Sequence, residues 1–279
     1  MSLASNNDAI PAASDDSLAE FIDRHRRLFV LTGAGCSTDS GIPDYRNANG
    51  EWKRTPPVTY QAFVGSPACR QRYWARNLVG WRRFGSALPN ATHRALAKLE
   101  QRDKLVLLLT QNVDRLHQAA GQQRVIDLHG RMDIIRCLAC ERRLPRAEFQ
   151  AELLRLNPAW ANVEALIAPD GDADIDEQDF SDFVVPVCAD CGGMLKPDVV
   201  FFGENVPRER VDAAMQAMLE ADAMLVVGSS LMVYSGYRFV HAAAAAHKPV
   251  AAVNLGHTRA DALLTLKVDQ SCAQALSFI

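Results

Sequence analysis

The chain has 279 residues, of which 48% are hydrophobic and 23% charged, and its formal net charge is −3. This much apolar material can fill a sizeable core, which excludes extensive disorder, and the weak negative charge gives no general basic field for nucleic acid. No uninterrupted apolar run reaches the about eighteen residues that a membrane-spanning helix needs. We therefore expect neither a specific nucleic-acid partner nor a membrane partner.

The N-terminal segment, residues 1–17, is rich in Ser, Asn, Asp and Ala. It has neither the basic start and apolar stretch of a secretory signal nor the arginines of a mitochondrial transit peptide. We expect a short mobile leader on a cytoplasmic protein. The cysteines agree with a reducing compartment, because four of the seven form two Cys-x-x-Cys pairs, a grouping typical of metal binding rather than of disulfides.

Strand-like and helix-like patterns alternate along the chain. Four apolar runs end in small polar residues, namely LFVLTGAGCS at 28–37, KLVLLLTQN at 104–112, AMLVVGSS at 223–230 and PVAAVNLG at 249–256. Helical patterns occupy 91–103, 208–221 and 235–248. The alternation predicts an α/β fold, a parallel sheet with helices on both faces. Ligands of such sheets lie outside the carboxyl ends of the strands, so the four polar turns are expected to form one site.

Two segments interrupt this alternation. The first, about 47–90, is rich in aromatic residues and arginine and contains helix-breaking prolines, which predicts short helices over the sheet edge. The second, 131–195, carries both cysteine pairs and is expected to form a small inserted module. Its acidic piece at 169–182 is interpreted as a solvated loop. The larger domain then consists of 18–130 and 196–279.

The four paired cysteines are Cys137, Cys140, Cys188 and Cys191. Their spacing is that of two zinc knuckles, and four thiolates complete a tetrahedral Zn²⁺ site without leaving an open position. The metal is therefore expected to be structural. A redox pair or free core cysteines are the alternatives.

Glycines and amides follow the first two apolar runs. The Gly33-Ala34-Gly35 turn allows backbone amides to approach a pyrophosphate, although the third glycine of a plain Rossmann fingerprint is absent and a structural tight turn remains an alternative. Asp114 has the position of a helix cap. Capping leaves the adjacent amides of Gln111 and Asn112 unexplained, and these suit hydrogen bonding to a ligand.

His129 lies between a short strand pattern and the cysteine module, at a domain junction where clefts form. A histidine with an ordinary pKa of about 6.5 is a suitable general base at neutral pH. A lone histidine is nevertheless more often structural. The other histidines, in helical or loop patterns, are taken as structural.

Seven motifs together resemble the sirtuin signature. They are TGAGCSTDSGIPDYR (32–46), TQNVDRLH (110–117), LHG (128–130), the two Cys-x-x-Cys pairs, KPDVVFFGE (196–204), VVGSSL (226–231) and VNLG (253–256). The resemblance implies a Rossmann-type domain joined to a smaller zinc-binding domain, with NAD⁺ and an acyl-lysine protein substrate meeting between them.

The resemblance also implies roles for individual residues. Cofactor binding would fall to Gly33, Ala34, Gly35, Asp44, Tyr45, Arg46, Gln111, Asn112, Val113, Asp114, Gly228, Ser229, Ser230, Asn254, Leu255, Gly256 and Cys272. Val200 and Phe202 would flank the acyl-lysine. The catalytic residues would be His129, Asn112 and Asp114, with His129 taking a proton from the ribose hydroxyls after the acyl oxygen has displaced nicotinamide. The products would be the free lysine, nicotinamide and O-acyl-ADP-ribose.

The spacing of the cysteine pairs and the PDYR ending resemble the class II, sirtuin-4-like branch, which includes many bacterial proteins, and we expect a bacterial member. That branch is associated with weak deacetylation, removal of other acyl groups and ADP-ribosyl transfer. The prediction is an NAD⁺-dependent protein-lysine deacylase. A protein mono-ADP-ribosyltransferase and a non-catalytic NAD⁺-sensing module are the alternatives. Tyr73 and Arg76 have the spacing of a desuccinylase pair, but Arg82-Arg83 aligns at least as well, so a desuccinylase is not predicted.

Overall fold

Six parallel strands form the central sheet in a computed structural model that describes residues 15–175 and 178–279. Neighbouring strands follow the order β11-β10-β9-β1-β2-β3, and every pair is parallel. Their bounds are β1 Leu28–Thr32, β2 Leu105–Thr110, β3 Val125–Asp127, β9 Ala223–Val227, β10 Val250–Val253 and β11 Leu266–Val268. Read from β3, this is the order of a dinucleotide-binding sheet, whose topology reverses beside its first strand. The predicted parallel α/β sheet is confirmed.

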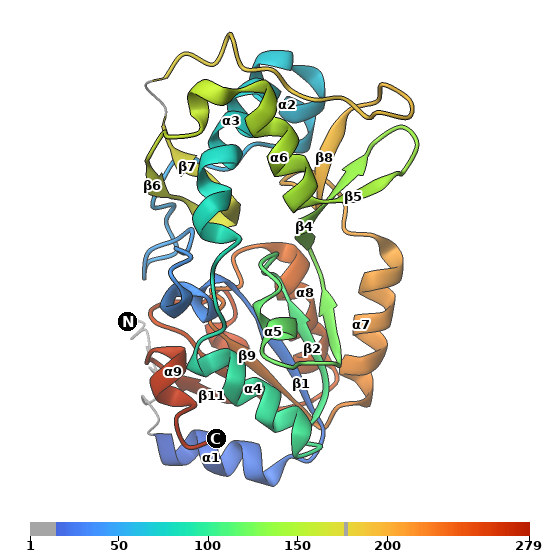
Figure 1. The fold of residues 1–279 in the computed structure, drawn as a ribbon. Coiled ribbons are helices and arrows are strands. Elements are labelled where there is room, and N and C mark those ends of the chain that lie inside the picture. The colour runs from blue at the N-terminus through green and yellow to red at the C-terminus, as the bar shows by residue number, and fades with distance from the viewer. Residues whose placement is uncertain (1–14, 176–177) are drawn as a thin grey trace, which may run out of the picture.

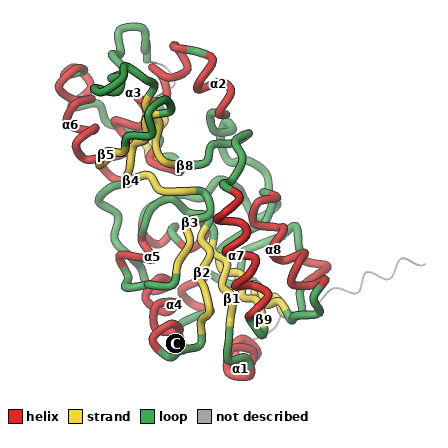
Figure 2. Tube along the Cα trace, turned by 90° about the vertical axis from the view of Figure 1, so that its right-hand side faces the viewer, coloured by secondary structure: helices red, strands yellow, loops and turns green. Residues whose placement is uncertain are grey.

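Helices cover both faces of this sheet (Figures 1 and 2) because the side chains of a strand point alternately to opposite sides. On β1, Leu28 and Val30 pack into the core under α1, α4 and α9, whereas Phe29 and Leu31 pack under α7 and α8. The helices of this large unit are α1 Asp15–Arg24, α4 Ala91–Gln101, α5 Leu116–Ala119, α7 Arg208–Glu220, α8 Tyr234–Ala245 and α9 Cys272–Ala275. Short 3₁₀ turns are η1 Ala34–Cys36, η2 Thr38–Ser40 and η5 Asp261–Leu263. No helix within the described ranges has the length and apolar character to cross a bilayer.

A smaller unit lies beyond the carboxyl ends of the large sheet (Figure 1). Its antiparallel sheet has the order β5-β4-β8, and a two-stranded ladder joins β6 to β7. The strands are β4 Gly130–Cys137, β5 Arg143–Pro145, β6 Leu166–Ile167, β7 Ala173–Asp174 and β8 Leu195–Val199. The helices are α2 Tyr60–Gly65, α3 Pro67–Phe84, α6 Arg146–Leu156, η3 Pro158–Trp160 and η4 Pro169–Gly171.

The sequence predicts that the aromatic segment 47–90 forms short helices over the edge of the large sheet. The structure differs from this prediction. It supplies α2 and the 18-residue α3 to the smaller unit. Trp74 is fully buried, with its ring centroid 4.6 Å from that of Phe149 on α6, and Phe63 of α2 packs in the same core. Aromatic side chains gain most from a large apolar partner surface. Here the partner is the cysteine-containing segment, which lies far away in the sequence.

Two boundaries differ from those expected. Strand β8 pairs antiparallel with β4, so residues 196–199 lie in the smaller unit rather than in the large domain. At the N-terminal end α1 begins at Asp15, so residues 15–17 of the expected leader are helical, and residues 1–14 lie outside the described residues.

The acidic segment 169–182 is more than a solvated loop. Both carboxylate oxygens of Asp172 accept 2.8 Å hydrogen bonds from Arg76 of α3. A Cβ added to Gly80 of α3 would lie 2.3 Å from the carbonyl oxygen of Gly171. The segment is therefore fastened to α3 by a bidentate ion pair and by a backbone approach that only glycine permits. Its residues 176–177 lie outside the described part of the chain.

Candidate active site

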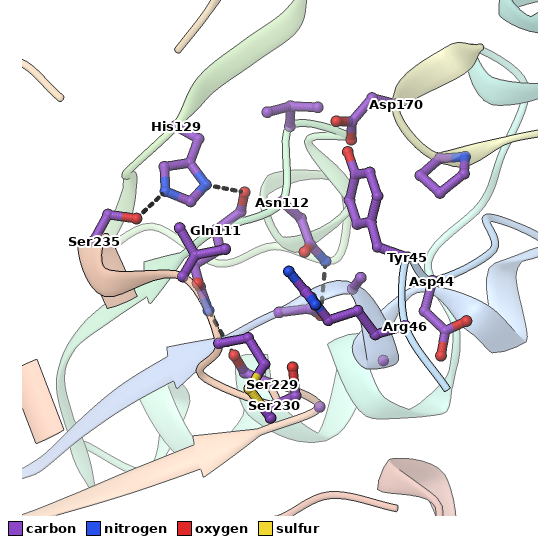
Figure 3. Close-up of a pocket in the computed structure, with 18 of the residues that line it drawn as sticks. Asp44, Tyr45, Arg46, Gln111, Asn112, His129, Asp170, Ser229, Ser230 and Ser235 are labelled. Carbon is purple, nitrogen blue, oxygen red and sulfur yellow. Dashed lines mark hydrogen bonds between the residues drawn. The ribbon is translucent and has the colours of Figure 1, made fainter. Parts of the chain in front are cut away.

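A cavity of about 560 Å³ opens between the two units, at the carboxyl ends of the parallel strands (Figure 3). The large unit contributes the residues that follow β1, β2, β9 and β10, among them Gly33, Gln111, Gly228 and Asn254, and the smaller unit contributes Val200 after β8. This volume is typical of small-molecule and cofactor sites. The polar turns that the sequence predicted to form one site do meet here.

Most of the residues singled out from the sequence line this cavity. They are His129, Gly33, Ala34, Gly35, Asp44, Tyr45, Arg46, Gln111, Asn112, Val113, Asp114, Val200, Phe202, Gly228, Ser229, Ser230, Asn254 and Leu255. Gly256 and Cys272 lie behind the lining. A Cβ added to Gly256 would be 2.4 Å from the carbonyl oxygen of Ala48, and a Cβ added to Gly228 would be 3.1 Å from the Sγ atom of Cys272. These two residues support the loops that form the wall.

The turns after β1 and β9 interlock through glycines. The amide of Gly35 donates to the carbonyl of Gly228 at 2.9 Å. A Cβ added to Gly228 would lie 2.5 Å from the amide nitrogen of Cys36, and its φ of +62° is one that other residues adopt only with strain. At Gly33 an added Cβ would be 2.9 Å from the Gly228 carbonyl oxygen. The two turns therefore pack directly against each other through their backbones.

The polar groups after β1 and β2 form one hydrogen-bonded network. The Nδ2 amide of Asn112 donates to the Gly33 carbonyl and to Ser37 Oγ, both at 3.0 Å, and Ser37 Oγ donates to Asp114 Oδ2 at 2.6 Å. The other oxygen of Asp114 accepts from the Leu116 amide at 2.9 Å. Asp114 therefore binds the amide of the first residue of α5, whose N-cap residue is Arg115, and it also lines the cavity. Burial raises its pKa, and the bond from Ser37 opposes that rise.

His129 is held at both ring nitrogens (Figure 3). Its Nδ1 atom lies 3.0 Å from the carbonyl oxygen of Gln111, and its Nε2 atom lies 2.7 Å from Ser235 Oγ. A carbonyl oxygen can only accept, so Nδ1 carries the proton and Nε2 accepts from the serine hydroxyl. Burial lowers the His129 pKa to about 4; the Gln111 carbonyl opposes this, while Arg210 and Arg238 add to it. The imidazole is therefore neutral at physiological pH, with one lone pair, on Nε2.

An aromatic wall closes the cavity on the side of the smaller unit. Trp52 meets Phe202 edge to face with ring centroids 5.7 Å apart, and Tyr45 lies at a similar angle to both rings. The guanidinium of Arg46 stacks 3.9 Å from the Trp52 ring centroid, and its Nη1 donates to the Gly50 carbonyl at 2.7 Å. The loop that carries Asp44, Tyr45 and Arg46 is thus folded back on itself beside the Phe202 wall.

Several residues that line the cavity were not predicted from the sequence as site residues. Ser37 lines the cavity and belongs to the motif TGAGCSTDSGIPDYR, so its place in that motif is the feature of the sequence that could have identified it. Ser235 was read only as the start of a helical pattern. Asp170 reaches the cavity from η4, in the acidic segment, and burial together with the nearby Asp172 raises its pKa to about 7. Nothing in the sequence places Asp170 beside the other residues.

The four paired cysteines converge at the far end of the smaller unit. Their Sγ atoms all lie within 4.8 Å of one another, with 3.5 Å between Cys137 and Cys191 and 3.7 Å between Cys140 and Cys188. Zinc–sulfur bonds of about 2.3 Å in a tetrahedron require sulfur separations of about 3.8 Å. Backbone amides of Cys140 and Ala139 lower the Cys137 pKa to about 6, which favours the thiolate form. The cluster is positioned to bind one structural zinc ion.

Known proteins resemble the chain in both sequence and structure. A model of the Sir2 family matches residues 33–235. An "NAD-dependent protein deacetylase" from Xanthomonas campestris pv. campestris (strain 8004) is 70% identical over 94% of this chain and 90% of the relative. "NAD-dependent protein deacylase Sirt4" from Drosophila melanogaster is 46% identical over 95% of this chain and 87% of the relative.

A solved structure described as "Sir2-p53 peptide-NAD+" has a TM-score of 0.76 at 30% identity and covers 95% of this chain and 97% of its own. Another, "Sir2 bound to acetylated peptide", has a TM-score of 0.75 at the same identity, with the same coverage. The resemblance inferred from seven short motifs is thereby confirmed, and the chain belongs to the Sir2 family, the sirtuins.

Proposed function

We propose that the protein removes acyl groups from lysine side chains of other proteins and consumes NAD⁺ in doing so. The observation that carries this proposal is the neutral imidazole of His129, which lines a cavity between glycine turns and an aromatic wall and whose Nε2 lone pair accepts from Ser235 on the same wall. Sirtuin relatives named deacetylase or deacylase support the reaction class. The acyl-lysine protein partner and the cytoplasmic location remain predictions.

The residues of the large unit would hold NAD⁺. The glycine turns at 33–35 and 228 line the cavity and would leave room beside their backbone for a pyrophosphate, while the amides of Gly33, Gly35 and Gly228 themselves donate to main-chain carbonyls. The amide and carboxylate network of Asn112 and Asp114 offers donors and acceptors for the nicotinamide and its ribose. NAD⁺, when bound, supplies the ribose carbon that accepts the acyl oxygen as nicotinamide departs.

His129 would act as the general base. Its Nε2 atom would accept a proton from a ribose hydroxyl of bound NAD⁺, while Nδ1 would keep its own proton and go on donating it to the Gln111 carbonyl. Because the pKa of His129 is about 4, nearly all enzyme molecules carry the unprotonated, active form of the base at neutral pH. The Gln111 carbonyl stabilises the imidazolium that forms.

Val200 and Phe202 would flank the acyl-lysine chain. The amide of Val200 donates to the His129 carbonyl at 2.7 Å, so the wall of the acyl channel is anchored directly to the residue that carries the base. Apolar walls suit the aliphatic lysine stem and exclude water, which would otherwise hydrolyse NAD⁺ without any transfer of the acyl group. Cys137, Cys140, Cys188 and Cys191 would hold a structural zinc ion at the other end of β4 and β8.

The decisive experiment is mass spectrometry of lysine peptides that bear acetyl, longer fatty acyl, lipoyl, succinyl and methylglutaryl-type groups, incubated with enzyme and NAD⁺. NAD⁺-dependent loss of one acyl group is the expected result, and it names the acyl class. Transfer of ADP-ribose to a protein without acyl loss would instead establish a mono-ADP-ribosyltransferase. NAD⁺ binding with no consumption would identify a non-catalytic sensing module.

Gly228→Ala is expected to weaken NAD⁺ binding at least tenfold. The new methyl group would strain a left-handed backbone and collide with the amide of Cys36, so the turns after β1 and β9 would separate. Calorimetric titration with NAD⁺ measures the effect. Gly121→Ala is the matched control, because its φ of +98° imposes similar strain while no atom lies within 4 Å of the added Cβ. Equal NAD⁺ affinity in both variants would contradict the assigned pyrophosphate site.

A further inference from the structure

Ser235 is a residue of the first turn of α8 that lines the cavity and bonds His129. Its Oγ atom is 2.7 Å from Nε2, the nitrogen that carries the lone pair of the ring. Because Nε2 has no proton, the serine hydroxyl is the donor. The only basic atom of the imidazole therefore already has a partner, supplied by the first turn of α8, which lies beside His129 (Figure 3).

The backbone around Ser235 fixes this contact from two sides. A Cβ added to Gly236 would be 2.5 Å from Gln111 Oε1, so the first turn of α8 lies directly against the end of β2. The main-chain carbonyl of the same Gln111 accepts the Nδ1 proton of His129. The imidazole is thus held between a carbonyl after β2 and a hydroxyl on α8, two elements that are themselves in contact.

We propose that Ser235 is a positioning residue for His129: in the free enzyme its hydroxyl, on the cavity wall, donates to the Nε2 lone pair, fixes the orientation of the ring and keeps that nitrogen unprotonated. This inference rests on the proposed function, in which Nε2 is the general base. A substrate hydroxyl takes over from Ser235 as the donor to Nε2 when the site fills. Ser235 therefore acts before the chemical step, by preparing the ring in the state that the substrate needs.

The charged groups around His129 set the direction of the expected pH effect. Arg238, one turn further along α8, and Arg210 of α7 both disfavour a protonated ring, and burial disfavours it more strongly. The Gln111 carbonyl acts in the opposite direction. All of these groups remain when only the serine hydroxyl is removed. Since a donor to the lone pair stabilises the neutral ring, its loss raises the His129 pKa.

The kinetic test compares Ser235→Ala, Ser235→Thr and the natural protein, with NAD⁺ and the best acyl peptide, from acidic to alkaline pH. The profile of kcat/KM reports the free enzyme, whereas that of kcat reports the loaded complex. In Ser235→Ala we expect kcat/KM for NAD⁺ at neutral pH to fall about fivefold. Its acidic limb should move up by roughly half to one pH unit, the equivalent of one neutral hydrogen bond. Because a substrate hydroxyl replaces Ser235 in the loaded complex, kcat should change less than about twofold and its limb should stay in place.

The threonine variant keeps the hydroxyl and is expected to restore the limb. The matched control is Ser86→Ala, which also removes a helix-bound serine hydroxyl, one that donates at 3.0 Å to carbonyls at the end of α3. A purely structural role for Ser235 would lower both kcat and kcat/KM without moving either limb. That pattern, or an equal effect of Ser86→Ala, would overturn the proposal.

A second readout needs no turnover. Proton titration of ¹⁵N-histidine-labelled protein by NMR, with the His129 signals assigned from His129→Gln, gives the tautomer and the pKa of the ring directly. We expect an unprotonated Nε2 and a pKa that rises by roughly half to one unit in Ser235→Ala. An unchanged Nε2 shift and pKa would refute the contact even in an active enzyme. Absence of acyl loss from every peptide would refute the proposed function instead, and the NMR result would still decide the role of Ser235.

Discussion

Replacing His129 with alanine is expected to lower kcat/KM for deacylation by about 10²- to 10⁴-fold, the usual contribution of a general base. Alanine removes the Nε2 lone pair, which is the base that the proposal assigns to the ribose hydroxyl. NAD⁺ binding should change little, because the hydrogen bonds of the imidazole go to Gln111 and Ser235 rather than to the glycine turns that would hold the pyrophosphate. Initial rates of nicotinamide release, together with calorimetric NAD⁺ binding, separate the two effects.

His241→Ala is a suitable control because His241 is an exposed residue of α8, outside the cavity lining. It should retain the natural rate. The natural enzyme should also keep its kcat/KM well below pH 6, where an ordinary histidine is mostly protonated, since burial holds the His129 pKa at about 4. Natural turnover in a folded His129→Ala variant would sink the mechanism.

Removal of the metal is expected to have the second large effect. Without a cation, four thiol groups would remain within 4.8 Å of one another, two of them, Cys137 and Cys188, buried in the core of the smaller unit. Structural zinc contributes folding free energy directly, and sites of this kind lose their fold when it is chelated. We expect a strong chelator to lower the melting temperature by on the order of 10 °C. Activity should be lost as well, because β8 runs from the cluster to the cavity wall at Val200.

Cys140→Ala tests the same point without a chelator. Cys140 is exposed, so its replacement leaves no cavity in the core and removes only a ligand. Cys69→Ala on α3 is the control, since Cys69 lies outside the cluster. Elemental analysis should find one zinc per natural chain and substantially less in Cys140→Ala. A folded, active natural protein without zinc would contradict the prediction.

The large unit was predictable because its signals are local. Strands such as β1 and β9 are fully buried, so they appear in the sequence as uninterrupted apolar runs. Because ligands of open parallel sheets bind outside the carboxyl ends of the strands, the polar residues after these runs could be assigned to one site. The smaller unit was harder to predict. The aromatic face of α3 indicates burial, but only the folded chain shows that Phe149 rather than the sheet edge is its partner.

The same limit applies within the site. Gly33, Asn112 and His129 stand in motifs whose residue types suit a ligand, so they could be singled out from the sequence. Ser235 and Asp170 could not, because a serine at a helix start and an aspartate in an acidic stretch are ordinary surface residues. Their position depends on the packing of α8 against β2 and of η4 against α3. Contacts of this kind form between segments that are far apart in the chain, so no pattern in the local sequence indicates them.

Because the acidic segment is attached to α3, the position of Asp170 does not depend on the turns that would hold the dinucleotide. Asp170 reaches the cavity from a segment that is fastened by Arg76 and by the close approach at Gly80, and neither of these residues lines the cavity. The glycine turns of the large unit form the opposite wall. The carboxylate of Asp170 is therefore placed by contacts within the smaller unit, whereas the glycine turns are placed by the large sheet.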